Sequence, residues 1–216
     1  MSAKRLAVLV VPVLVLVSSA VAQDFMQSGS LNQLSITAGR TFVSTQTIQN
    51  PPAGDPDPKI HFGNPASVAF NYGRLLKSKA FLGLYAELPV AIYFRMDLNT
   101  YTDQIPKDIG ALFVTPSARL NFFPGDSVTP WVSVGGGYGR FRESSDLNFY
   151  GANPGPTGSN TGVVQFGAGL DAWIFPSWGI RGEARDFYSG NPALNVTTTN
   201  SRQHNYYVGV GIAHRF

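Results

Sequence analysis

The chain has 216 residues, of which 44% are hydrophobic and only 13% are charged, and it contains no cysteine. Disulfides and thiolate metal sites are therefore excluded, and the charged fraction is well below the ~25% of an ordinary soluble domain. The 16 basic and 13 acidic residues give a net charge of +3, and they form no basic patch of the kind that binds nucleic acid.

The first 22 residues have the pattern of a cleavable signal peptide. Lys4 and Arg5 are positive, residues 6–17 are apolar, and Ala20 and Ala22 suit cleavage before Gln23. The apolar run is shorter than the ~20 residues that cross a bilayer as a helix. We predict a signal peptide at residues 1–22, an N-terminal lead-in at residues 23–33 and a β-barrel at residues 34–216.

Alternation of apolar and polar residues with period two recurs along the rest of the chain. In residues 82–94, Leu84 and Leu88 lie on one face and Glu87 lies on the other. Eight such segments make the even number of strands that bacterial single-chain barrels have: residues 34–43, 67–76, 82–94, 112–122, 131–141, 164–174, 178–188 and 206–216. The predicted fold class is all-β, an eight-stranded antiparallel up-and-down transmembrane β-barrel preceded by a cleavable signal peptide.

The predicted connections alternate in length, as in membrane barrels with short periplasmic turns and longer outer loops. Short ones fall at residues 76–79, 124–129 and 175–177, and long ones at residues 45–65, 95–108, 142–161 and 189–203. Aromatic residues at strand ends predict two interfacial girdles: Phe122, Phe123, Trp131, Phe175 and Trp178 at one end, and Tyr93, Phe94, Phe187, Tyr188 and Tyr206 at the other.

A soluble, lipocalin-like periplasmic barrel with its apolar face turned inward is an alternative that the same alternation allows. The segregation of loop lengths and the terminal Phe216 favour the membrane.

The chain resembles the small eight-stranded outer-membrane barrels grouped around the OmpA-type transmembrane domain and OmpX-like proteins. The resemblance rests on residues 130–141, 167–172 and 182–188 and on the alternating strand that ends at Phe216. It implies the fold and an outer-membrane location in a Gram-negative bacterium, and Phe216 looks like the family's assembly signal, read by the outer-membrane insertion machinery. His214 stands where an aromatic residue is commoner in the family. One activity is not implied, because the family has structural, adhesive and enzymatic members.

Six charged residues fall on the faces opposite the apolar rows, where they are predicted to point inward: Glu87, Arg119, Asp171, Arg181, Glu183 and Arg185. The interior of an eight-stranded barrel is just wide enough for side chains to fill it, and buried charges must be paired. We therefore expect a plug of salt bridges. A narrow ion path is the alternative.

Catalysis would need a nucleophile and a base within reach of each other. The histidines are His61, His204 and His214, and Ser189 and Ser201 lie in the same region as His204. A lipid-modifying enzyme is therefore a further alternative, but no catalytic, cofactor or metal motif is recognised.

The expected function is that of an integral outer-membrane barrel with a structural or surface-interaction role carried by its loops. The expected partners are outer-membrane lipids and lipopolysaccharide, the insertion machinery and a surface ligand, with no nucleic acid and no cofactor. We expect a monomer.

Overall fold

A computed structural model describes residues 30–216. The predicted signal peptide and most of the predicted lead-in lie outside the described residues. The described chain is all-β, with these strands in order: β1 (Asn32–Val43), β2 (Gln46–Thr47), β3 (Lys59–Phe62), β4 (Ala66–Lys79), β5 (Leu82–Asn99), β6 (Asp108–Val114), β7 (Ser117–Phe122), β8 (Val128–Glu143), β9 (Ser159–Trp173), β10 (Trp178–Gly190) and β11 (Arg202–Arg215). Within residues 30–216 no helix is long and apolar enough to cross a membrane.

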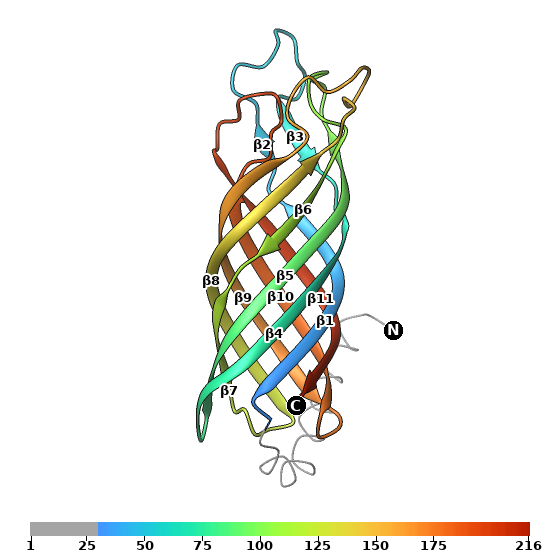
Figure 1. The fold of residues 1–216 in the computed structure, drawn as a ribbon. Coiled ribbons are helices and arrows are strands. Elements are labelled where there is room, and N and C mark those ends of the chain that lie inside the picture. Colours follow the sequence, from blue (N-terminus) through green and yellow to red (C-terminus); the bar gives the residue numbers. More distant parts are fainter. Residues whose placement is uncertain (1–29) are drawn as a thin grey trace, which may run out of the picture.

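The strands close into an antiparallel barrel, because β1 pairs with β4 on one side and with β11 on the other (Figure 1). β6 and β7 are two parts of one wall strand, since both lie between β5 and β8. The break falls at Thr115 and Pro116, where proline has no N–H to donate to a neighbouring strand. The wall is therefore a ring of eight strands, which confirms the predicted fold class.

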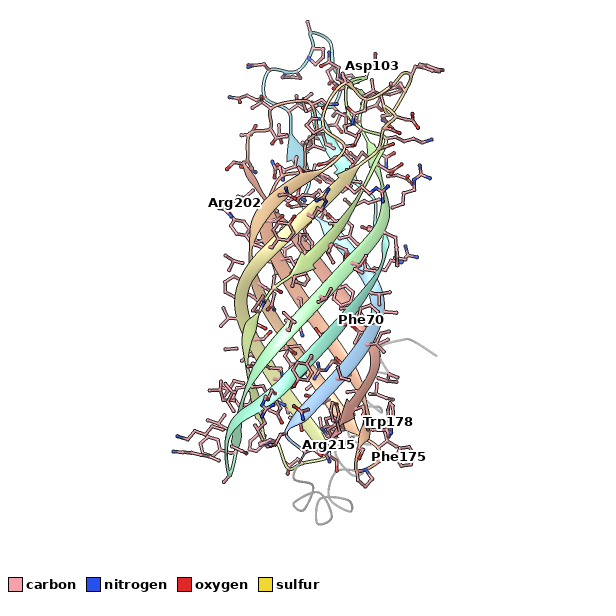
Figure 2. All side chains as sticks on the ribbon, in the orientation of Figure 1. Phe70, Asp103, Phe175, Trp178, Arg202 and Arg215 are labelled. Atoms are coloured by element: carbon pink, nitrogen blue, oxygen red, sulfur yellow. The ribbon has the colours of Figure 1, made fainter. Side chains whose placement is uncertain are left out.

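The apolar rows face outward, as the alternation predicts. Leu84, Leu88 and Leu170 are 39%, 40% and 51% exposed, whereas Glu87, between the first two, is 3% exposed. Figure 2 shows Phe70 on the outer wall, Phe175 and Trp178 near the end with short turns, and Asp103 among the long loops at the other end. A lipocalin-like barrel would need these apolar rows inside, so that alternative is wrong.

Several strands run further toward the long loops than predicted. β5 continues past residue 94 to Asn99 and β8 past residue 141 to Glu143, while β11 begins at Arg202. The pairing of β5 with β6 shifts between Tyr93 and Met96, so the period-two pattern breaks at the point where the strand still continues. A strand needs an apolar outward row only where it faces lipid, whereas its backbone can pair with its neighbours beyond that level. The alternation therefore ends before the strands do.

The girdle prediction is wrong for three of its residues. Tyr93, Trp131 and Phe187 are almost fully buried inside the barrel. Phe94 and Trp178 are exposed on the outer wall. Successive residues of a strand point to opposite faces, so Tyr93 and Phe94 cannot both belong to the girdle.

Candidate functional site

The structure places all six predicted inward charges inside the barrel, each at most 4% exposed. They come from four wall strands: Glu87 from β5, Arg119 from β7, Asp171 from β9, and Arg181, Glu183 and Arg185 from β10. Their side chains meet across the lumen. We call this set the charged level.

Glu87 is the centre of the charged level. Its Oε1 accepts from Arg119 Nη1 at 3.1 Å and lies 3.6 Å from Arg181 Nη1, and its Oε2 lies 3.2 Å from Arg185 Nη1. Arg185 Nε also donates to Glu183 Oε2 at 2.9 Å. Three cations and three anions therefore compensate one another in a space that excludes water, which is the condition under which buried charges are tolerated.

Arg181 and Asp171 form a bidentate pair. Arg181 Nε donates to Asp171 Oδ1 and Nη2 to Oδ2, each at 2.7 Å. This two-bond geometry is the strongest form of a guanidinium–carboxylate contact.

Neutral side chains that the sequence did not single out complete the charged level. Gln33 donates to Asp171 Oδ2 at 2.9 Å and accepts from Arg119. Thr37 donates to Glu183 Oε1 at 2.5 Å, and Ser35 accepts from Arg181 at 2.9 Å. All three come from β1, at alternate positions of one face, and that spacing is the sequence signal that could have found them.

Trp131 lies among the three arginines. The guanidinium carbons of Arg181, Arg185 and Arg119 are 5.1, 5.0 and 5.7 Å from the centroid of its ring. A ring face attracts cations within about 6 Å. Trp131 therefore adds cation–π attraction to the ion pairs of the three arginines.

An aromatic level follows the charged level toward the long loops. It consists of Tyr93, Phe113, Phe141 and Phe187, all buried. Phe113 stacks on Phe187 at 5.0 Å between ring centroids and meets Phe141 edge-on at 5.9 Å. On β10, Phe187 follows Arg185 in the direction of the loops, so the lumen changes from ionic to apolar within a few residues.

The four long loops pack on the aromatic level as a cap, which we define as residues 44–65, 100–107, 144–158 and 191–201. Each of the first, second and fourth loops contributes buried apolar side chains to the same cluster as Phe113, among them Ile60, Ile105 and Leu194. The cap is thus held on the barrel by a core that it shares with the aromatic level.

Backbone hydrogen bonds join the loops of the cap to one another. The first and fourth loops are joined by Gln49 N donating to Thr197 O and Thr199 N donating to Thr47 O, both at 2.8 Å. The second and third are joined by Asn148 N donating to Ile105 O at 2.9 Å. Such bonds fix the positions of loops that would otherwise be mobile.

The histidines lie outside this interior. His61 Nε2 is 2.9 Å from Asp57 in the cap, and His214 stacks on Trp178 at 4.3 Å on the wall. His204 Nδ1 is 2.7 Å from Asp186 Oδ2, with Tyr188 and Tyr206 beside its ring.

The two serines proposed to accompany His204 are not joined to it. Ser189 is buried, donates to Gly190 O at 2.9 Å and accepts from Asn205 Nδ2 at 3.0 Å, so it belongs to the interior. In the described part of the chain no hydrogen bond joins Ser201 to His204. The pairing of nucleophile and base on which the enzymatic alternative depended is therefore not assembled here.

Residues 30–216 hold no group of three or more histidine, aspartate or glutamate side chains arranged to bind a metal ion.

No protein-family model matches the chain, and no curated protein is significantly similar to it in sequence. Solved structures are similar in fold. The outer membrane protein OprG of Pseudomonas aeruginosa aligns with a TM-score of 0.53 and 13% identity, over 87% of this chain and 97% of its own. Neisserial surface protein A aligns with a TM-score of 0.50 and 15% identity, over 86% and 97%. These proteins establish the fold, that of the small eight-stranded outer-membrane β-barrels, and confirm the resemblance found in the sequence.

Proposed function

We propose that the mature chain is an integral outer-membrane barrel with a structural role, and that its cap is a surface for interaction with other molecules. The observation that carries this proposal is the filled interior, where the charged level and the aromatic level lie in series beneath a packed cap. A barrel of this width has room for side chains and little else. What remains accessible is the outer wall and the cap.

The outer wall supports insertion into lipid. Its outward side chains include Phe70, Phe166 and Val210, all large and exposed. Surface of this kind on a soluble protein would drive association, whereas in a bilayer it lies against acyl chains. The six residues of the charged level lie on the inner face of the same wall, away from lipid.

The cap supports a role in recognition. Tyr150 and Tyr101 are 91% and 64% exposed at its surface. Tyr101 and Phe149 also line a hollow of about 450 Å³, together with polar residues such as Asp57 and His61. Aromatic rings with a polar edge are enriched where proteins bind partners, so this side of the cap is where we expect a surface ligand to bind.

The membrane location of the protein and the exposure of its cap are tested together. We expect the mature protein in the outer-membrane fraction, with a faster gel migration before boiling than after it. A cysteine introduced at Tyr150 should react with a membrane-impermeant maleimide on intact cells, and one at Asp126, an exposed position in a short turn, should not. Recovery of the protein in the soluble periplasm would refute the proposal.

The closed ring also supports a monomer. β1 and β11 pair with each other without a break from Gln33–Arg215 to Val43–Asn205. A closed ring leaves no wall edge for another copy to extend. Light scattering of the detergent-solubilised protein, corrected for bound detergent, should give the mass of one chain.

A lipid-modifying enzyme is the second candidate, favoured by the Asp186–His204 pair on the outer wall. A carboxylate on one ring nitrogen orients a histidine to exchange a proton through the other. The candidate predicts that His204→Gln changes the lipid A species of the host as deletion of the whole protein does. An unchanged lipid A profile after deletion removes this candidate.

A further inference from the structure

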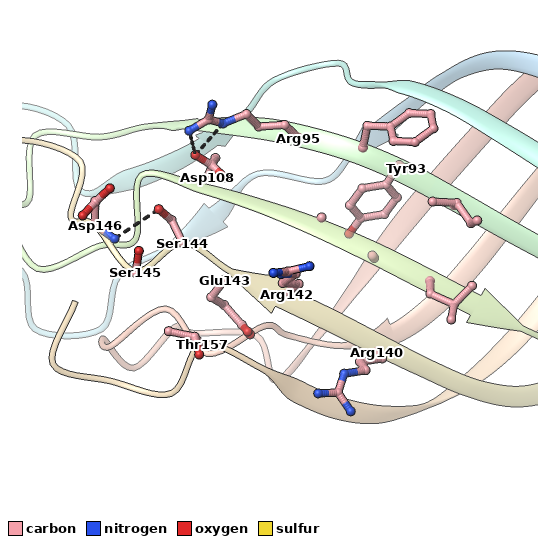
Figure 3. Close-up of a pocket in the computed structure, with 15 residues that line it drawn as sticks. Tyr93, Arg95, Asp108, Arg140, Arg142, Glu143, Ser144, Ser145, Asp146 and Thr157 are labelled. Carbon is pink, nitrogen blue, oxygen red and sulfur yellow. Dashed lines mark hydrogen bonds and ion pairs between the residues drawn. The ribbon is translucent and has the colours of Figure 1, made fainter. Parts of the chain in front are cut away.

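A groove of about 920 Å³ runs along the outer wall where β5, β6 and β8 approach the cap (Figure 3). Gly110 of β6 lies in it between larger neighbours, Phe94 on β5 and Arg142 on β8. Because glycine has no side chain, the outer surface of the wall is recessed between these two neighbours. Most of its lining side chains lie on the outer face, although buried Tyr93 and Glu143 also line it, and the groove includes no residue of the charged level.

The register of three strands places the groove's side chains. Arg142 pairs with Gly110, and Arg140 pairs with Leu112. The shift in pairing of β5 after Tyr93 lets Phe94 and Arg95, which are consecutive, both lie outside. A regular strand would send one of them inward.

The groove is apolar toward the middle of the barrel and cationic toward the cap. Ile92, Phe94 and Leu112 line its apolar part. Along β8 the outward residues change from Val134 and Tyr138 to Arg140 and Arg142. The change from apolar to charged marks the level at which lipid tails would give way to headgroups.

Two of the three arginines in the groove are available to a ligand. Arg95 is committed to Asp108, with Nη2 at 2.6 Å and Nε at 2.7 Å from the same oxygen. Arg140 and Arg142 are exposed and make no ion pair with any residue in the described part of the chain. They stand two positions apart on one strand, which separates their backbones by about 7 Å. Asp146 also lines the groove, from the cap loop that follows β8.

We propose that this groove binds the phosphorylated headgroup of an acylated lipid in the outer leaflet, with Arg140 and Arg142 on the phosphate and an acyl chain along Phe94 and Leu112. Guanidinium groups bind phosphate oxygens through paired, charge-assisted hydrogen bonds. The apolar part of the groove selects for the lipid over a free anion, because a phosphate alone would leave it unfilled. The inference rests on the proposed membrane location.

The test is lipid binding to the folded, detergent-solubilised full-length mature protein, measured by native mass spectrometry. We expect bisphosphorylated lipid A to bind, and Arg140→Gln combined with Arg142→Gln to weaken it about ten- to one-hundredfold, the range expected for losing charge-assisted hydrogen bonds. Arg140→Lys with Arg142→Lys keeps the charge without the paired donors and should give an intermediate loss.

The matched control removes the same charge from the other end of the wall. Arg74 and Lys77 are exposed on β4, near a short turn and outside the groove, so Arg74→Gln with Lys77→Gln should leave binding unchanged. The proposal is overturned if this control loses as much binding, if dephosphorylated lipid A binds equally well, or if inorganic phosphate displaces the lipid at similar concentration. If the protein is heat-modifiable and located in the outer membrane but fails this test, only the lipid site is refuted and the proposed function stands.

Discussion

Among residues 30–216, Glu87 is the single carboxylate that contacts three buried arginines. Replacing it with alanine leaves Arg119, Arg181 and Arg185 facing two anions, Asp171 and Glu183, in a space closed to water. Removing one partner of a buried ion pair costs about 3–5 kcal/mol. We expect Glu87→Ala to lower the free energy of unfolding by this amount, measured by urea titration of the protein in lipid vesicles.

The comparison for Glu87 is Asp57, whose partner His61 is more than half exposed. Asp57→Ala should change the free energy of unfolding by less than about 1 kcal/mol, as exposed pairs do. Equal losses at both positions would mean that the charged level carries no special share of the stability.

At the same scale, the alternation was enough to place Glu87 and the other five charges on the inner face. It was not enough to pair them, because Gln33 and Thr37 are neutral and lie across the lumen on a strand distant in the chain. Trp131 was misassigned for a related reason. Its position after a turn suggested the membrane interface. In the alternation of inward and outward residues along β8, however, Trp131 is an inward residue and faces the arginines.

Phe216 carries the remaining residue-scale prediction. It is exposed in the outward row that includes Ile212, and its backbone exchanges two hydrogen bonds of 2.9 Å with Asn32 across the seam. If the insertion machinery recognises the exposed side chain of Phe216, Phe216→Ala should lower the yield of heat-modifiable protein in cells several-fold. The free energy of unfolding of the protein that does fold should be unchanged. Phe175→Ala, which removes an exposed ring from the same rim, should leave the yield unchanged.

At the scale of elements, the seam between β1 and β11 depends on glycine. A Cβ on Gly211 would stand 1.9 Å from Ile36 O and 2.6 Å from Thr37 Cα, both backbone atoms of β1. The strands must separate to admit it. We expect Gly211→Ala to prevent closure, with loss of the fast-migrating unboiled form on gels.

Gly182 is the matched position, because it lies on the adjacent strand β10 and a Cβ there would have no atom within 4 Å. Gly182→Ala should fold as the unaltered protein does. A folded Gly211→Ala barrel with unchanged stability would show that the seam has more freedom than these distances allow.

The elements themselves were largely predictable, since eight alternating segments correspond to the eight wall strands. Their ends were not. The shifted pairing in β5 after Tyr93 and the break at Pro116 interrupt the period-two pattern while the backbone ladder continues on either side. The shift after Tyr93 matters for the candidate lipid groove, because it lets Phe94 and Arg95 both lie outside, and the groove therefore could not be found from alternation alone.

At the scale of the whole molecule, the lumen has two obstacles in series beneath the packed cap. Passage requires ions to cross the charged level and then the aromatic level, and a series path is closed while either remains. Planar-bilayer recordings of the native protein should therefore show no discrete conductance. Phe113→Ala with Phe187→Ala removes the 5.0 Å stack but leaves the salt bridges of Glu87 and Asp171, so this variant should also stay closed.

A variant must weaken both levels before it can conduct. Adding Glu87→Ala to Phe113→Ala and Phe187→Ala leaves three arginines against two carboxylates, and the pathway that results should favour anions. Single-channel events in the triple variant, absent from Glu87→Ala alone and from the double phenylalanine variant, would support two independent obstacles. Discrete conductance in the native protein would instead support the channel alternative, because the side chains that fill the lumen would then have to move aside at rest.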